Sequence, residues 1–130
     1  MKLLVPVRYP LNGHSRETLE HAVEMAEEDD DFVVLHVDLY QASNGVSRRE
    51  LRRQVQNAVG EIDAAYVVRK GFVVEESILE EAVSSDVDVV VIGKNRSGKL
   101  RRAMRRMVGN DPRIEEFLGR NFDARIEVVD

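Results

Sequence analysis

A run of β-branched residues near position 90 constrains the fold of this chain more than any other feature. Residues 87–92 contain four valines and one isoleucine. The run is too short to cross a membrane, which takes about 20 apolar residues. Its β-branched side chains also favour a strand over a helix. Because apolar residues occupy both faces, we expect the strand to be covered on both sides, as the central strand of a parallel sheet is.

Four further strands are predicted at residues 3–7, 32–37, 64–68 and 125–129, with helical apolar patterns between them. The strand at 64–68 is short and mixed in character, so we expect it near an edge of the sheet. Alternating strands and helices are typical of a parallel, doubly wound sheet. We therefore predict one α/β domain over residues 1–130, with a Rossmann-like three-layer α/β/α architecture and five parallel strands.

Local patterns predict where the helices begin and which faces they bury. Ser15 is the predicted N-cap of the first helix, and Ser47 with Glu50 forms a capping box for the second. The predicted inner faces are Leu19, Ala22, Val23 and Ala26; Leu51, Val55, Ala58 and Ile62; and Ile78, Leu79, Ala82 and Val83. Later helices are predicted to bury Leu100, Ala103, Met104, Met107 and Val108, and then Ile114, Phe117 and Leu118. The expected solvent face of the third helix carries Glu75, Glu76, Glu80 and Glu81.

The charge balance argues against several classes of function. With 19 basic and 24 acidic residues the net charge is −5, so most of the surface would repel a nucleic acid. The chain has no cysteine, which excludes a thiol nucleophile and a sulfur-ligated metal. No apolar segment reaches the length of a membrane span or a signal peptide. We expect a cytoplasmic protein with no membrane partner.

Positive charge is nevertheless concentrated directly after the valine-rich strand. The cations there are Lys94, Arg96, Lys99, Arg101, Arg102, Arg105 and Arg106, and no acid lies among them. Open α/β sheets bind ligands beyond the carboxyl ends of their strands, so this segment is a candidate anion site. The alternative is a solvated helix face whose arginines pair with surface acids.

Four stretches resemble the universal stress protein family, and the likeness runs over the whole chain. They are the opening KLLVPV, the LHV at 35–37, the DVDVVVIG at 86–93, and the RSG at 96–98. The resemblance implies the strand order 3-2-1-4-5 and a homodimer. Many members bind ATP over the carboxyl ends of the first and fourth strands, so the resemblance also implies an ATP site there.

The nucleotide motif of that family is altered in this chain. Binding members carry G-x2-G-x9-G-[ST] after the fourth strand, where glycines let backbone amides approach phosphate. Gly93 matches the first glycine, but Arg96 occupies the second position and Gly98 follows two residues late. Gly109 and Asn110 resemble the last pair but are displaced. Binding members also carry an Asp soon after the first strand, near the base and ribose, where this chain has Arg8. We expect weak, altered or absent ATP binding, with ATP or another adenine nucleotide as the candidate ligand.

The resemblance assigns candidate nucleotide-binding residues to two sides of a cleft. The adenosine side comprises Pro6, Val7, Val37, Ile92 and Gly93, and the phosphate side Arg96, Ser97, Gly98, Gly109 and Asn110. Arg8 is a candidate for reaching a phosphate or for filling the space of the missing Asp. His14 is a further candidate for contacting an anion, whereas His36 is interpreted as a strand residue held by a neighbour. No metal ligands and no catalytic residues are predicted.

We therefore expect a regulatory or binding module rather than an enzyme, dimerising through Ile126 and Val128 of the last strand, with a protein partner as a further expectation. One alternative is an ATP hydrolase or phosphotransferase that uses the basic loop Gly93–Arg106. A second alternative is polyanion binding through the arginine helix.

Overall fold

The structure, a computed structural model, describes residues 1–42, 45–93, 118 and 125–129. In chain order its elements are β1 (Lys2–Pro6), α1 (Gly13–Met25), β2 (Asp31–Leu39), the short 3-10 helix η1 (Tyr40–Ala42), α2 (Arg48–Val59), β3 (Ala65–Gly71), α3 (Val74–Ser84), β4 (Val89–Gly93) and β5 (Arg125–Val129). Strands and helices alternate as the apolar patterns predict. The helices predicted beyond residue 99 lie outside the described residues, apart from Leu118.

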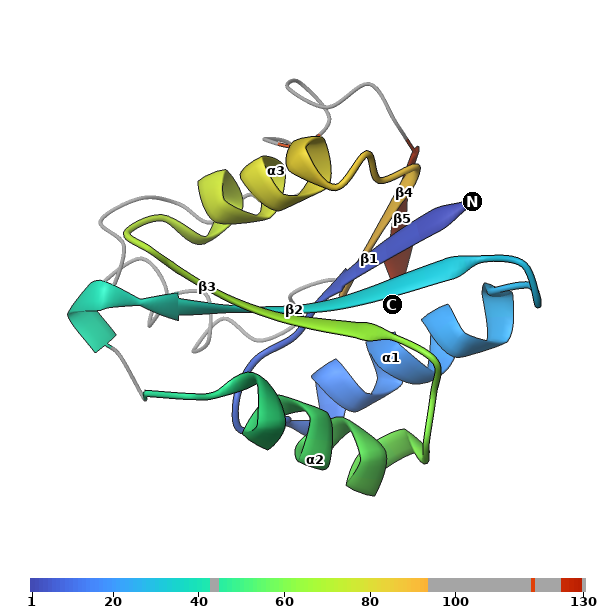
Figure 1. Cartoon of the computed structure of the whole chain (residues 1–130), viewed down its shortest axis with the longest axis horizontal. Coiled ribbons are helices and arrows are strands. Elements are labelled where there is room, and N and C mark those ends of the chain that lie inside the picture. The colour runs from blue at the N-terminus through green and yellow to red at the C-terminus, as the bar shows by residue number, and fades with distance from the viewer. Residues whose placement is uncertain (43–44, 94–117, 119–124, 130) are drawn as a thin grey trace.

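The five strands form one parallel sheet in the order β3-β2-β1-β4-β5, which confirms the predicted fold class and strand order. The valine-rich strand β4 lies between β1 and β5, and β3 is an edge strand as expected. Residues 89–92 are buried because the sheet has a helical layer on each side. Figure 1 shows α1 and α2 on one face and α3 on the other.

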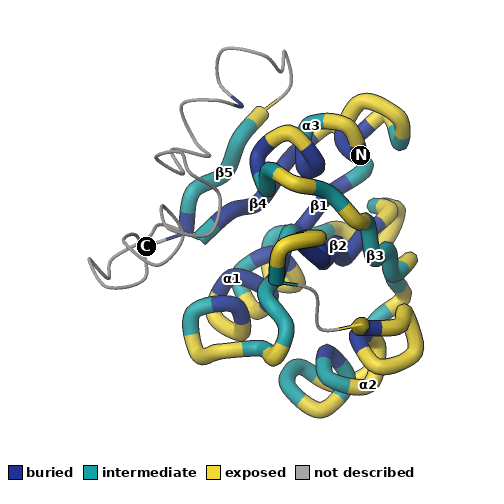
Figure 2. Tube along the Cα trace, turned by 90° about the vertical axis from the view of Figure 1, so that its left-hand side faces the viewer, coloured by how far each residue is buried: buried dark blue, intermediate teal, exposed yellow. Residues whose placement is uncertain are grey.

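Each face of the sheet has its own apolar core. Alternate strand residues point to opposite faces, so Leu3 and Val34 pack with α1 and α2, whereas Leu4 and Leu35 pack with α3. Leu118, predicted to face inward, is fully buried in the core on the α3 side. Figure 2 shows the same distribution, with burial concentrated in the central strands and on the inner sides of the helices.

The helix caps agree with the sequence in one case and differ in the other. Ser47 caps α2, where its Oγ accepts the backbone N–H of Glu50 at 3.1 Å, and this confirms the Ser47 half of the predicted capping box. The Glu50 carboxylate accepts the Ser47 hydroxyl at 3.1 Å. The cap of α1 is Asn12 rather than Ser15, and its Oδ1 accepts the Ser15 N–H at 2.7 Å. Starting the helix three residues earlier leaves the Ser15 hydroxyl free to accept the N–H of Arg8 at 3.2 Å. The prediction for Ser15 was therefore wrong.

Several helix faces are narrower than predicted. Val23 and Val83 lie toward solvent, and Val83 is 61% exposed. Ala58 is only half-buried, and Ile62 lies beyond the end of α2. Each exposed valine directly follows a buried alanine, so it lies outside the row of helix residues that faces the sheet.

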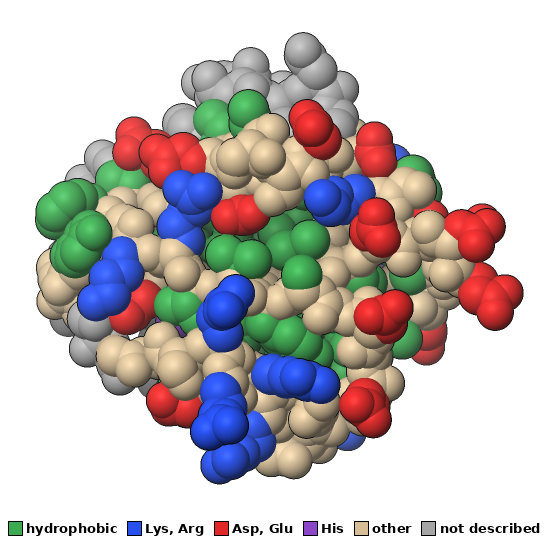
Figure 3. Space-filling model, viewed as in Figure 1, with side chains coloured by type: hydrophobic (Ala, Val, Ile, Leu, Met, Phe, Trp, Pro, Cys, Tyr) green, Lys and Arg blue, Asp and Glu red, His purple; other side chains and the backbone are tan. Residues whose placement is uncertain are grey.

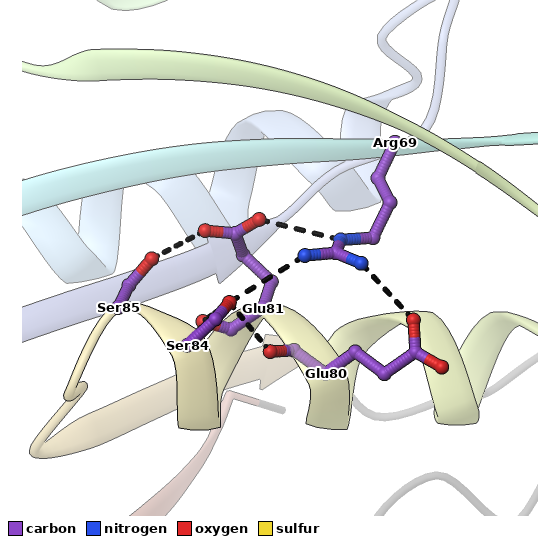
Figure 4. A network of polar contacts seen from close by, with 5 residues as sticks. All are labelled: Arg69, Glu80, Glu81, Ser84 and Ser85. Atoms are coloured by element: carbon purple, nitrogen blue, oxygen red, sulfur yellow. Dashed lines mark hydrogen bonds and ion pairs between the residues drawn. The ribbon is translucent and has the colours of Figure 1, made fainter.

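The acidic face predicted for α3 is only partly solvated, which corrects the sequence interpretation. Glu81 is buried because Arg69 of β3 reaches across to it, with Nε 3.4 Å from Glu81 Oε1 and Nη1 3.0 Å from Glu80 Oε2. The Ser85 hydroxyl donates a further hydrogen bond to Glu81 (Figure 4). Glu75 is also buried, and loss of hydration raises the pKa of its carboxyl. Glu76 and Glu80 are exposed as predicted.

Candidate functional site

The candidate site lies at the carboxyl ends of β1 and β4, where the direction of strand winding reverses. The strands that follow β1 in sequence, β2 and β3, lie on one side of it, whereas β4 and β5 lie on the other side. The Val7 N–H donates to the Leu35 carbonyl at 2.7 Å, which extends the pairing of β1 with β2 beyond Pro6. Such a reversal point leaves a crevice in which open α/β sheets bind ligands.

Four of the five residues predicted for the adenosine side lie at the ends of two neighbouring strands. Pro6 ends β1 and Val7 follows it, while Ile92 and Gly93 end the adjacent strand β4. Val37 is in the interior of β2, paired in register with Arg69, because β2 extends two residues beyond the predicted end. The predicted phosphate side lies outside the described residues: Arg96, Ser97, Gly98, Gly109 and Asn110.

Arg8 follows β1 at the centre of this region. Its backbone is held by the Ser15 hydroxyl, and its side chain is half-buried. Loss of hydration lowers the pKa of the Arg8 guanidinium and is the single cause of that shift. No carboxylate in the described part of the chain forms an ion pair with it. The site therefore contains a partly dehydrated cation with no counter-charge among the described residues.

His36 projects from β2 toward the same segment of chain. It is 7% exposed, and its Nδ1 lies 3.1 Å from the carbonyl oxygen of Val7. A carbonyl can only accept, so Nδ1 carries the hydrogen and Nε2 of the neutral ring is an acceptor. Burial lowers the pKa of His36, while the Val7 carbonyl and the nearby Asp38 carboxylate act in the opposite direction. The prediction that a neighbour holds His36 is confirmed.

His14 approaches from the other side of β1. It lies in the first turn of α1, not in a loop as the sequence suggested. A Cβ added at Gly93 would be 2.5 Å from His14 Nε2 and 2.6 Å from Thr18 Oγ1. The end of β4 therefore packs directly on α1, and a side chain at position 93 would require His14 and Thr18 to move. Both His14 Nε2 and His36 Nε2 are buried without a hydrogen-bond partner among the described residues.

Side chains of α2 hold the loop between β1 and α1 in place, which the sequence did not reveal. Gln54 Oε1 accepts the Leu11 N–H at 2.8 Å, and the Tyr9 hydroxyl donates to Glu50 Oε2 at 3.4 Å. The Tyr9 ring also lies 6.0 Å, centroid to centroid, from the His36 ring. These contacts join residues about forty positions apart, so no local pattern could have indicated them.

A second basic surface lies on α2, which sequence reasoning did not single out. Figure 3 shows Lys and Arg side chains gathered over α2, at the bottom of that view. The helix contributes four exposed arginines, namely Arg48, Arg49, Arg52 and Arg53. The pattern that could have revealed them is the repeated RR pair at i and i+4, which lies on the solvent side of Leu51 and Val55.

Other classes of site find no support in the described residues. Within the described ranges, no three His, Asp or Glu side chains are grouped as a metal site would require. Among the helices of the same ranges, none is long and apolar enough to cross a membrane. The chemistry available around β1 is that of a guanidinium, two imidazoles and backbone groups, which suits binding of a polar, anionic ligand.

No protein-family model matches the sequence, and no curated protein is similar to it at a significant level. Solved structures are similar over the whole chain. They include universal stress protein UspA from Lactobacillus plantarum, at 12% identity and a TM-score of 0.68, covering 100% of this chain and 97% of that one. A universal stress protein from Archaeoglobus fulgidus is 13% identical with a TM-score of 0.64, covering 100% and 98%.

A universal stress protein solved in complex with cAMP is also similar, at 13% identity and a TM-score of 0.57, covering 98% of this chain and 97% of that one. These structures share the length and the layered arrangement of strands and helices described above. The chain therefore has the universal stress protein fold.

Proposed function

We propose that this chain is a ligand-binding regulatory module of the universal stress protein type, which binds ATP weakly or not at all. The observation that supports this is the reversal point itself, where β1 and β4 end side by side and Gly93 keeps the end of β4 free of a side chain. Ligands of open α/β sheets bind at this position. The related protein solved with cAMP is consistent with a nucleotide as the ligand class.

The residue after β1 argues against the usual mode of ATP binding. Resemblance to the binding members places an acid here, near the base and ribose, and this chain has Arg8. Arginine reverses the sign of the local charge and has a longer side chain than aspartate. A base seated against an acid in other members would therefore meet a half-buried cation here.

Calorimetric titration with ATP, ADP, AMP and cAMP, with and without Mg²⁺, tests this proposal. We expect the dissociation constant of ATP to be above about 100 μM. At least one of ADP, AMP and cAMP, which have fewer phosphates, should bind more tightly. Micromolar affinity for ATP would contradict the proposed loss of ATP binding. If none of the four nucleotides binds, the module does not bind nucleotides and the proposal fails.

The same preparation separates a binding module from an enzyme. Our proposal is a module without steady turnover, so ATP should remain intact over hours at stoichiometric protein. Steady hydrolysis that is lost in Arg96→Ala would instead favour the alternative in which the basic loop acts on ATP. Measuring released phosphate by a coupled assay distinguishes the two, with heat-denatured protein as the blank.

We further propose that the module is a homodimer formed through β5. This strand is an edge of the described sheet and pairs with β4 on one side. Exposed strand edges promote association, and pairing across a twofold axis would cover this one. Ile126 and Val128 are half-buried, so each keeps some apolar surface that a second copy could cover.

A charge on the proposed dimer edge should weaken the dimer. We expect Val128→Asp to shift the mass measured by light scattering toward that of a monomer, because a carboxylate would lose hydration at the interface. Val83→Asp introduces the same group on the exposed face of α3 and should leave the mass unchanged. An unchanged mass for Val128→Asp, with its circular dichroism spectrum intact, would refute dimerisation through β5.

A further inference from the structure

The outer edge of β3 is the longer of the two edges of the described sheet. β3 pairs with β2 over all of its 7 residues, and no backbone hydrogen bond within the described ranges reaches its other side. Natural proteins protect such edges with proline, bulges or short strands. β3 has no proline and keeps its register from Ala65 to Gly71, whereas β5 at the opposite edge has 5 residues. The edge of β3 therefore presents a row of backbone donors and acceptors to another strand.

The side chains of β3 are only partly covered by the rest of the described structure. Val67 packs on the α3 side of the sheet and Val68 on the α2 side, and both are half-buried. Their register partners on β2, Leu35 and His36, are buried. Figure 3 looks onto this edge and shows apolar side chains across its middle, between α3 above and α2 below. An added strand would cover this apolar surface on both faces of the sheet.

Two exposed aromatic rings extend the apolar surface past the end of β3. Phe72 directly follows the strand and is 68% exposed, and Tyr40 of η1 is 53% exposed. Their ring centroids are 4.7 Å apart, and Gln41 Nε2 donates to the Phe72 carbonyl at 2.9 Å. The side-chain amide thus ties the turn after β3 to η1. Aromatic residues are enriched at protein interfaces, so this pair indicates a surface that a partner covers.

Positive charge lies along one side of the edge. Lys70 is two residues after Val68 and so projects on the same α2 side, with its Nζ 6.0 Å from the centre of the Tyr40 ring. At the other end of the strand, Arg52 of α2 lines an open pocket of about 380 Å³ together with Tyr66 of β3. Cations therefore border the α2 side of β3 near both of its ends.

These cations are largely without counter-charge in the part of the chain that the structure describes. Arg52 meets a carboxylate only at 3.9 Å, on Glu61, and both side chains are exposed. The other exposed arginines of α2 and Lys70 form no ion pair with a described residue. On the α3 side, by contrast, Arg69 is already paired with Glu80 and Glu81. The two sides of the edge therefore call for different side chains in a partner.

A second copy of this chain fits the edge poorly. Antiparallel pairing of two β3 strands across a twofold axis would continue the sheet and place both α2 helices on the same face. Each α2 covers its own β3 and carries four exposed arginines, namely Arg48, Arg49, Arg52 and Arg53. Like charges would then meet across the junction, which is unfavourable. An acidic segment of a different protein meets the same arginines with opposite charge.

We infer that the β3 edge binds an extended segment of a partner protein, which adds a strand to the sheet with carboxylate side chains toward α2 and apolar side chains toward α3. Main-chain hydrogen bonds supply affinity in this mode of recognition, and alternate side chains supply specificity. β2 separates β3 from β1, so this surface is distinct from the candidate ligand site. The inference does not depend on nucleotide binding.

A synthetic peptide of alternating glutamate and valine, as long as β3, tests the inference on the full chain. We expect calorimetry at low salt to give a dissociation constant of about 100 μM or lower. Added salt should weaken binding, because part of the attraction is between exposed charges. In hydrogen exchange followed by NMR, the β3 amides that point away from β2 should exchange about tenfold more slowly or less when the peptide is bound. Absence of binding would overturn the inference.

Two control peptides separate strand addition from general attraction of charge. Replacing every glutamate by lysine reverses the charge, and methylating every backbone nitrogen keeps the charge but removes the donors that pair with a strand edge. We expect neither peptide to bind. Binding of the methylated peptide as tight as that of the parent would overturn the inference, as would binding of the parent without protection of the β3 amides.

Variants of the protein locate the charges that the peptide meets. Arg52→Gln and Lys70→Gln should each weaken binding of the glutamate–valine peptide by about threefold, and the double variant by about tenfold. Arg16→Gln removes an exposed arginine of α1 and should leave the affinity unchanged. Equal affinities of the double variant and Arg16→Gln, with circular dichroism spectra intact, would contradict the inference.

The free protein tests whether a second copy occupies the edge instead. In Val128→Asp without peptide, we expect the outward β3 amides to exchange rapidly and the mass by light scattering to be independent of concentration. Protected β3 amides together with a mass that rises with concentration would show that copies of this chain pair through β3. That result would overturn the inference of an acidic partner segment.

Discussion

An Ile78→Ala variant is expected to lose about 3 kcal/mol of unfolding free energy, the middle of the range for deleting large aliphatic side chains from a core. Ile78 is 1% exposed and lies between α3 and the sheet, packed with Leu35 and Val90. Truncation removes apolar contacts and leaves a cavity that strands on a rigid parallel sheet cannot close. In thermal unfolding followed by circular dichroism, this corresponds to a fall in melting temperature of about 10 °C.

Val83→Ala, on the same helix, is the matched control. Val83 is 61% exposed, so its truncation removes little buried surface, and alanine has the higher helix propensity. We expect the unfolding free energy of this variant to stay within about 0.5 kcal/mol of the wild type. Similar losses for Ile78→Ala and Val83→Ala would mean that α3 buries the wider face, with Val83 included, that the sequence pattern predicts.

A Gly93→Ala variant is expected to be destabilised by about 1–3 kcal/mol, the usual cost of overpacking a tight contact. The new methyl group would be 2.5 Å from His14 Nε2 and 2.6 Å from Thr18 Oγ1. Thr18 is 2% exposed, and its hydroxyl donates to the His14 carbonyl at 2.9 Å, so it has little freedom to move. Urea unfolding would measure this loss directly.

Gly13→Ala is the control for that variant. Gly13 opens α1, and a Cβ there would meet nothing within 4 Å. Alanine in a helix is favoured over glycine, so this variant should be as stable as the wild type or more stable by about 0.5 kcal/mol. If Gly93→Ala proved as stable as Gly13→Ala, α1 would not be packed closely on the end of β4.

Features encoded by neighbouring residues could be predicted. The N-cap of α2 needs only Ser47 and Glu50, three positions apart, and the Ser47 hydroxyl accepts the Glu50 N–H as expected. The run at 87–92 required cover on both faces, and β4 has it. The helix stripe that includes Leu51 and Val55 is likewise buried.

Errors arose where a local pattern was consistent with two arrangements. Asn12 and Ser15 are both good N-caps, and the choice depends on whether Ser15 is needed to hold the Arg8 backbone. Glu81 belongs to an acidic run that reads as a solvated face. It is buried because Arg69, twelve positions earlier and on β3, reaches it.

The sequence by itself determined the element types, their alternation and the parallel sheet, because hydrophobic periodicity and capping are local properties of the chain. Resemblance to the universal stress proteins supplied the strand order. Only the tertiary structure decided the character of the candidate site. The His36 ring meets the Val7 carbonyl across 29 positions, and Gly93 packs on a helix that begins 80 residues earlier at Gly13. Hydration, counter-charge and close contact depend on such distant neighbours, so no sequence pattern can specify whether the cation at Arg8 is paired.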